Sequence, residues 1–283
     1  MTSLAHCPFC LRQVGRAHIT DDHGDRQGVG NAGQSSKAEL VLVQKRHRSC
    51  AARWQGLRST RCPDGTMKHI HGLDIPTALP DLCDPRRMAL LVYDMQVGIC
   101  SQVETAGHIM ARVGQVLSAA RTAGMRVVFT RHLSLPKTWM GVTQFRMAMA
   151  WQRKDEPDAV APWFLRDSPG FQIVSDLTPA PEDAVFDKLA MSAFEGTPLT
   201  FALRDCGILA VAIVGIATEI GIEPTARHAA DLGFIPVLVA DACGAGEEQA
   251  AQRSLDSLRF AGDAIITDVK TFTDLLDRRS PSS

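Results

Sequence analysis

Residues 88–96 read Met-Ala-Leu-Leu-Val-Tyr-Asp-Met-Gln. The continuous apolar run in this stretch, 88–93, ends at the acidic residue Asp94. Apolar and polar side chains do not alternate in this run, which is typical of a strand that is covered on both faces. Further short apolar runs follow along the chain, at 125–130, 184–186, 209–214, 236–240 and 264–267. We therefore expect six strands, all of them largely buried.

Helical patterns separate most of these runs. They lie at 103–123, 198–206, 223–232, 247–260 and 269–276. Several of them are followed by a glycine, which is a common end signal for a helix. Strands that alternate with helices favour a parallel sheet with right-handed crossovers. The sequence therefore predicts an α/β fold: a doubly wound, Rossmann-like, parallel six-stranded sheet flanked by helices.

The composition of the chain changes near Met67. Residues 1–66 carry ten basic and five acidic residues, a net charge of +5, whereas the remaining residues carry a net charge of −6. The first segment also lacks a sustained helical or strand period. We expect residues 1–66 to be a disordered or non-native N-terminal extension, and residues 67–283 to form the folded domain.

The N-terminal extension contains a Cys-x-x-Cys pair, Cys7 and Cys10. Further soft metal ligands in the same segment are His6, His47, Cys50 and Cys62. A structural zinc site usually takes two close ligand pairs, and only one close pair is present. A redox pair of this type follows a strand, and no strand is expected here. Zinc binding and redox activity are therefore the less favoured alternatives for this segment.

Charge and hydropathy exclude several classes of partner. The formal net charge is −1, so no global field attracts nucleic acid. No run of 18 apolar residues occurs, so we expect no transmembrane helix. The first residues lack a secretory signal pattern, and eight cysteines in 283 residues do not suggest a disulfide scaffold. We expect a cytoplasmic protein that acts on a small molecule, without nucleic-acid or membrane partners.

Polar side chains gather where the predicted strands end. These residues are Asp94, Gln96, Arg131, His132 and Lys188. In doubly wound sheets, ligands bind outside the carboxyl ends of the strands, so this edge is the expected site. The first strand is not followed by a Gly-x-Gly-x-x-Gly motif, which disfavours a dinucleotide. We expect no cofactor and no metal ion.

A long connection at 133–183 interrupts the regular pattern. It contains three of the four tryptophans of the chain and several prolines. Connections of this length usually carry a lid or a partner surface. Gln144 and Arg146 lie in this connection and are candidates to reach the site, because an arginine fork suits a carboxylate.

Three motifs resemble one family. They are the Asp94-Met95-Gln96 triplet, the block at 188–194 (KLAMSAF) and the run at 215–234 (GIATEIGIEPTARHAADLGF). Their order and spacing are similar to those of the isochorismatase-like hydrolases, within the cysteine hydrolase superfamily. That family includes nicotinamidases, carbamoylsarcosine amidohydrolase and isochorismatases. The resemblance spans about residues 86–270.

The resemblance implies roles for individual residues. The position of the usual catalytic cysteine holds Gly221, Asp94 is the general acid/base, and Lys188 is its cationic neighbour. A non-proline cis peptide bond is implied between Ile216 and Ala217. Together with the strand-end and long-connection candidates, the expected substrate-binding residues are Gln96, Arg131, His132, Gln144, Arg146, Ile216 and Ala217. A homo-oligomer is also expected.

These roles predict hydrolysis without a thioester. Without a side chain at Gly221, no acyl-enzyme forms there. An isochorismatase-type reaction instead needs an acid that protonates a vinyl ether and a water that captures the resulting cation, on a small carboxylate-bearing substrate. One alternative is a C–N amidohydrolase with a different nucleophile, for which Cys100 and Cys243 are candidates. The other is a catalytically silent homologue that binds a small acid.

Overall fold

The computed structural model describes residues 67–279, which lie within one compact unit, Arg61–Ser283. The predictions for residues 1–66, including the Cys7 and Cys10 pair, lie outside the described residues. Among the described residues, no helix is both long enough and apolar enough to cross a membrane.

The first part of the described chain holds β1 (Lys68–Ile70), β2 (Leu73–Ile75), α2 (Leu79–Leu82), β3 (Met88–Tyr93), α3 (Val97–Cys100), α4 (Ala106–Thr122) and β4 (Arg126–His132). The connection after β4 holds η2 (Lys137–Trp139), α5 (Val142–Gln152), η3 (Pro157–Ala159), η4 (Pro169–Phe171) and η5 (Ser175–Leu177). The rest holds β5 (Ala184–Lys188), α6 (Leu199–Asp205), β6 (Ala210–Ile216), η6 (Thr218–Ile222), α7 (Glu223–Asp231), β7 (Ile235–Gly244), α8 (Glu248–Ala261), β8 (Ile265–Thr267) and α9 (Val269–Asp277).

Six strands form one parallel sheet in the order β5-β4-β3-β6-β7-β8. The chain runs outward from β3 through β4 to β5, returns to the other side of β3 at β6, and continues to β8. The predicted doubly wound sheet of six parallel strands is confirmed. The direction of winding reverses between β3 and β6, and this reversal point is where such sheets bind their ligands.

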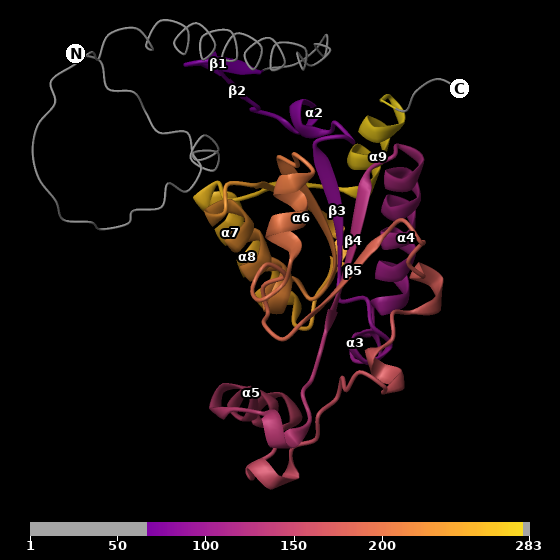
Figure 1. Ribbon diagram of the computed structural model, residues 1–283, viewed down its shortest axis with the longest axis vertical. Helices are drawn as coiled ribbons and strands as arrows, with labels where there is room; N and C mark the ends of the chain where they lie inside the picture. Colours follow the sequence, from indigo (N-terminus) through magenta and orange to yellow (C-terminus); the bar gives the residue numbers. More distant parts are fainter. Residues whose placement is uncertain (1–66, 280–283) are drawn as a thin grey trace, which may run out of the picture. The chain divides into compact units, whose positions relative to one another are not determined.

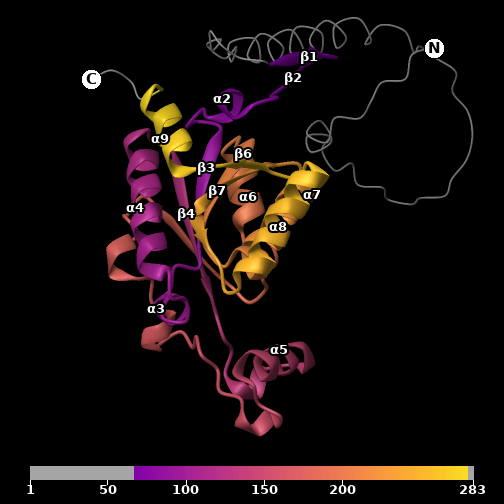
Figure 2. The same ribbon diagram turned by 180° about the vertical axis from the view of Figure 1, so that it is seen from behind.

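Helices cover both faces of the sheet. Helices α4 and α9 lie on one face, and α6, α7 and α8 on the other (Figures 1 and 2). Strand β3 serves both cores, because Met88, Leu90 and Val92 face the α4 side while Leu91 and Tyr93 face the other. This period of two, with every residue buried, explains why the sequence of β3 shows no polar alternation.

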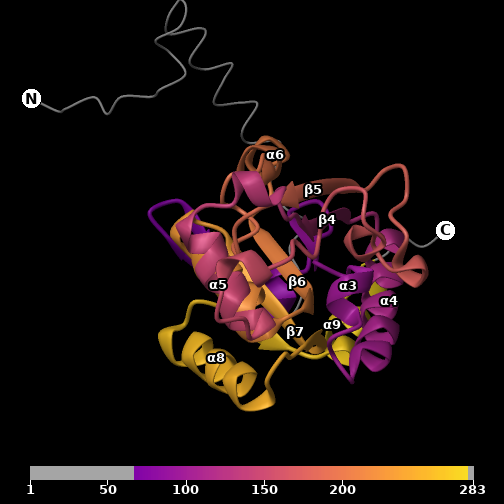
Figure 3. The ribbon, with the colours of Figure 1, turned by 90° about the horizontal axis from the view of Figure 1, so that it is seen from below.

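Strand β7 is longer than its apolar run predicts. The sequence predicts a strand at 236–240, whereas β7 extends to Gly244. The extension occurs because the ladder with β6 resumes after an irregularity, so that Gly215 pairs with Cys243 and Ile216 with Gly244. Beyond the carboxyl ends of the strands, the long connection carries α5, which overlaps β6 when the molecule is seen from below (Figure 3).

Candidate active site

The carboxyl ends of β3 and β6 bring two segments together at the reversal point. Tyr93 pairs with Gly215 at the end of the ladder, and Asp94 follows with a positive φ of 47°. A non-glycine residue in this region is uncommon, although aspartate tolerates it better than most. On β6, the peptide bond between Ile216 and Ala217 is cis, which confirms the prediction for this bond.

A buried ion pair joins the ends of β3 and β5. Lys188 Nζ donates to Asp94 Oδ2 at 2.6 Å, and their side chains are 0% and 4% exposed, respectively. Lys188 Nζ also donates to the carbonyl oxygen of Ala190 at 3.2 Å. Thr130 Oγ1 donates to the other carboxylate oxygen of Asp94 at 2.7 Å. Both charges are thus paired and hydrogen-bonded, as burial requires.

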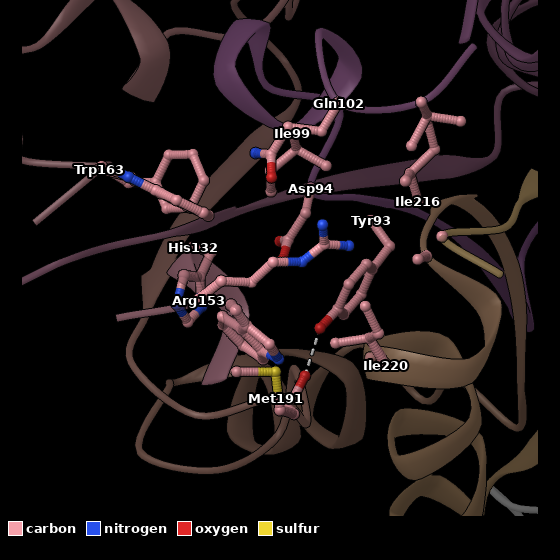
Figure 4. Close-up of a pocket in the computed structure, with 16 residues that line it drawn as sticks. Tyr93, Asp94, Ile99, Gln102, His132, Arg153, Trp163, Met191, Ile216 and Ile220 are labelled. Carbon is pink, nitrogen blue, oxygen red and sulfur yellow. Dashed lines mark hydrogen bonds between the residues drawn. The ribbon is translucent and has the colours of Figure 1, made fainter. Parts of the chain in front are cut away.

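Tyr93 packs beside this pair. The Lys188 ammonium lies 4.4 Å from the centroid of the Tyr93 ring, within cation–π range. The Tyr93 hydroxyl donates to the carbonyl oxygen of Met191 (Figure 4). A Cβ atom built on Gly221 would lie 1.9 Å from the Tyr93 hydroxyl oxygen. The Tyr93 hydroxyl therefore occupies the space into which a side chain at position 221 would extend.

A pocket of about 380 Å³ opens over these residues. It is lined by Tyr93, Asp94, Ile99, Gln102, Val103, His132, Trp151, Arg153, Trp163, Phe164, Met191, Ile216, Ala217, Ile220, Gly221 and Gly246. Of these lining residues, Asp94 is the only carboxylate and none is a cysteine. The Arg153 side chain points into the pocket in the direction of Asp94 and Tyr93 (Figure 4). The pocket therefore offers one acid, one guanidinium and an aromatic wall.

Comparison with known proteins agrees with this architecture. The isochorismatase domain matches residues 88–270, which is more than half of the chain. The chain belongs to the isochorismatase family. This family assignment covers all six strands of the parallel sheet and every residue of the pocket lining.

Solved structures share the fold of this isochorismatase-family chain. A cysteine hydrolase from Pseudomonas syringae pv. phaseolicola has a TM-score of 0.62 at 21% identity, with 70% of this chain and 96% of that chain covered. An isochorismatase family protein from Burkholderia thailandensis has a TM-score of 0.57 at 26% identity, with coverage of 68% and 96%. The N-carbamoylsarcosine amidase from Thermoplasma acidophilum has a TM-score of 0.53 at 22% identity, with coverage of 65% and 96%. Hydrolases with different reactions thus share this fold.

His132 lines the pocket of this isochorismatase-family hydrolase as a neutral imidazole. Burial, with the nearby Lys188 charge adding to it, lowers the pKa of His132 to about 4, while Asp94 opposes the shift. Its ring meets Phe164 edge to face at a centroid distance of 5.9 Å. At neutral pH, His132 can therefore donate one hydrogen bond and accept another, but it carries no charge to attract an anion.

Gln96 and Arg131 lie close to the site but outside the pocket lining. Gln96 is fully buried, and its amide exchanges two hydrogen bonds with the backbone of His132 and donates one to Phe171. Arg131 donates to Asp187 at 2.7 Å and stacks 4.4 Å from the Phe171 ring centroid. Both residues fix the long connection to the sheet in this structure.

The two candidates on α5 lie in different places. Gln144 lines an adjacent cavity of about 320 Å³ beneath α5, whereas Arg146 is exposed and lines neither cavity. The arginine that enters the main pocket is Arg153, directly after α5, with a positive φ of 52°. Sequence reasoning missed Arg153 because the pattern does not show where α5 ends. Trp151 and Trp163 form part of the same wall.

Cys100 and Cys243 do not line the pocket. Burial raises the pKa of Cys100 to about 11. Burial, together with the neighbouring Asp241, raises the pKa of Cys243 to about 12. Because the thiolate is the nucleophilic form, both cysteines are poorly reactive at neutral pH. Within residues 67–279, no group of three or more His, Cys, Asp or Glu side chains is arranged to hold a metal ion.

Proposed function

We propose that this isochorismatase-family hydrolase cleaves a small carboxylate-bearing substrate by acid-assisted water addition, without a cysteine nucleophile. The observation that carries the proposal is the pocket lining, in which Asp94 is the only carboxylate and no cysteine occurs. By the motif resemblance, Gly221 stands at the position of the family's usual nucleophile. Cys100 and Cys243 are outside the pocket, and their pKa values are raised.

Asp94 supplies the acid–base chemistry in this proposal. For a vinyl ether, a proton first passes from the Lys188 ammonium to the Asp94 carboxylate along their 2.6 Å hydrogen bond. Asp94 then donates this proton to the terminal carbon of the double bond, and an oxocarbenium ion forms at the ether-bearing carbon. Water adds to that carbon and gives its proton to the Asp94 carboxylate, and the return of this proton to Lys188 restores the ion pair. The hemiketal then collapses to a ketone and an alcohol. Lys188 and Thr130 hold the carboxylate in place through both of its oxygens.

Arg153 supports the choice of an anionic substrate. The charge of Lys188 is compensated by Asp94 at 2.6 Å, and His132 is neutral at neutral pH. Among the described residues that line the pocket, this leaves the Arg153 guanidinium as the uncompensated charge, since no ion pair of its side chain is found there. A guanidinium binds a carboxylate through two parallel hydrogen bonds. The aromatic side chains of Trp151 and Trp163 suit a compact, flat substrate beside it.

A hydrolysis screen with the full chain tests the proposal. The panel contains isochorismate, simpler carboxylate-bearing vinyl ethers, their methyl esters and small amides. We expect turnover of the free acids, measured as release of the keto acid, and little turnover of esters or amides. Hydrolysis of amides alone would favour an amidohydrolase, and binding without turnover would favour a silent homologue. A cytoplasmic location and a homo-oligomeric state remain predictions from the sequence.

A further inference from the structure

Tyr93 is the only tyrosine of the chain and occupies an unusual place in it. It ends a strand whose other residues are aliphatic or Met, and its ring is only 2% exposed. The ring lies under the Lys188 ammonium, and the hydroxyl reaches the Met191 carbonyl at the pocket wall. The Tyr93 hydroxyl is thus a polar group in the pocket wall, beside the Asp94 carboxylate.

Position 221 has no room for a side chain because of Tyr93. A Cβ atom there would lie 1.9 Å from the Tyr93 hydroxyl oxygen, 2.4 Å from Cζ and 2.6 Å from Cε1. Gly221 does not adopt a positive φ, so its backbone conformation does not itself demand glycine. The backbone cannot easily shift, because Gly221 N–H donates to Ala217 and its carbonyl accepts from Thr225 Oγ1 at 2.6 Å. Glycine is therefore required at position 221 because of the steric clash with Tyr93, not because of its backbone conformation.

We propose that the Tyr93 hydroxyl replaces the side chain at position 221 and binds the water that attacks the substrate. This inference rests on the proposed function, because it assigns the role of the family's nucleophile to that water. It makes Tyr93 a positioning residue that acts through the water, and it makes Tyr93 and Gly221 a coupled pair.

Hydrogen-bond geometry supports this assignment. A phenol has one hydrogen and two lone pairs, and the hydrogen of Tyr93 goes to Met191. The hydroxyl of Thr225 and the carboxylate of Asp94 also lie within hydrogen-bond reach of this hydroxyl. Even with Thr225 on one lone pair, the other is left to accept from a water in the pocket, next to Asp94. One hydrogen of that water points at Tyr93 and the other at Asp94, so its own lone pair faces the substrate. Burial and the Asp94 charge also raise the pKa of Tyr93 well above its ordinary value, which keeps the phenol protonated and prevents it from acting as a nucleophile itself.

A variant cycle tests the coupling without any substrate. Gly221→Cys is made in the wild-type chain and in a Tyr93→Val chain, where valine suits a strand. We expect the wild-type background to lose about 5 °C or more in melting temperature, or to fail to fold, because overpacking destabilises. In the Tyr93→Val background, we expect Gly221→Cys to change the melting temperature little, because the tyrosine ring no longer fills the space. Gly107→Cys is the matched control, since nothing lies within 4 Å of a Cβ atom at Gly107. Equal losses in both backgrounds would overturn the coupled pair.

Tyr93→Phe tests the water. This variant keeps the ring under Lys188 and removes only the hydroxyl. Crystal structures are determined for the full-length wild-type chain and for full-length Tyr93→Phe. The wild-type structure should show an ordered water on the Tyr93 hydroxyl, and the Tyr93→Phe structure should lack it. With a substrate from the screen, kcat should fall about 10- to 100-fold, while KM and the melting temperature stay near wild type. Unchanged kcat, or no water on the Tyr93 hydroxyl, would overturn the assignment. Both readouts are separate from the proposed function, which fails if the screen finds no hydrolysis or if Asp94 is dispensable.

Discussion

The side-chain amino group of Lys188 lies 2.6 Å from the carboxylate of Asp94, and neither side chain is more than 4% exposed. The two residues are 94 positions apart in the sequence and meet only because β3 and β5 end at the same edge of the sheet. Each residue is the counter-ion of the other in a place that water barely reaches. The pair therefore matters for folding as well as for the proposed chemistry.

Removing either charge should destabilise the protein. A buried ion whose partner has been removed costs about 3–5 kcal/mol. We expect Lys188→Met, which keeps the length of the side chain, to lower the free energy of unfolding by that amount in urea titrations. The double variant Asp94→Asn/Lys188→Met should recover part of the loss, because no unpaired charge remains. Additive losses in the double variant would contradict direct pairing.

Thiol alkylation should leave activity largely intact. Burial raises the pKa of Cys83 and of Cys243 to about 12, and that of Cys100 to about 11. Cys206 is exposed and does not line the pocket, so we expect it to react with iodoacetamide without effect on turnover. Turnover is measured before and after alkylation, with Cys206→Ser as the control. Rapid, stoichiometric loss of activity, with the alkylated residue identified as Cys100 or Cys243, would contradict the cysteine-free mechanism.

Arg153 should determine affinity for the substrate carboxylate. A hydrogen bond to a charged group contributes about 1.5–3 kcal/mol, which corresponds to roughly 10- to 100-fold in binding. Arg153→Gln should therefore raise KM by that factor and change kcat little. Arg146→Gln is the matched control, because Arg146 lies on α5 but is exposed and outside the pocket. If only Arg146→Gln raised KM, the sequence-based choice of Arg146 would be the better one.

Alkaline pH should destabilise the wild-type chain through Tyr93. Its folded-state pKa is raised well above 10, chiefly by burial, whereas the unfolded chain titrates near 10. Below pH 10 both states keep the proton. Above pH 10 the unfolded state loses it first, so stability falls as pH rises. Tyr93→Phe should show a shallower fall between pH 10 and 11 in thermal melts. Absorbance at 295 nm should detect no tyrosinate in the folded wild type at pH 10.5, and early ionisation would contradict the buried placement.

Much of the fold was predictable from local patterns. The apolar runs located all six strands of the parallel sheet, although β7 extends further than its run, because parallel strands buried on both faces leave an uninterrupted apolar sequence, as in Met88–Tyr93. The meeting of Asp94 and Lys188 was predictable because Asp94 directly follows β3, Lys188 ends β5, and the strand ends share one edge. The positions of Arg153 and Tyr93 in the pocket could not be predicted from local patterns. The place of Arg153 depends on how the long connection folds back, and Tyr93 reads as one more apolar strand residue until the distance to Gly221 is known.

Asp94→Asn is the variant that tests acid-assisted hydrolysis most directly. Asparagine keeps the size of the side chain but cannot deliver a proton. General acid–base catalysis contributes about 10²–10⁴-fold, so kcat on the substrate from the screen should fall by at least that order while binding stays similar. The measurement is made at a temperature where circular dichroism shows the variant fully folded, since Lys188 loses its counter-ion. A wild-type kcat in folded Asp94→Asn would contradict the assignment of Asp94 as the catalytic acid.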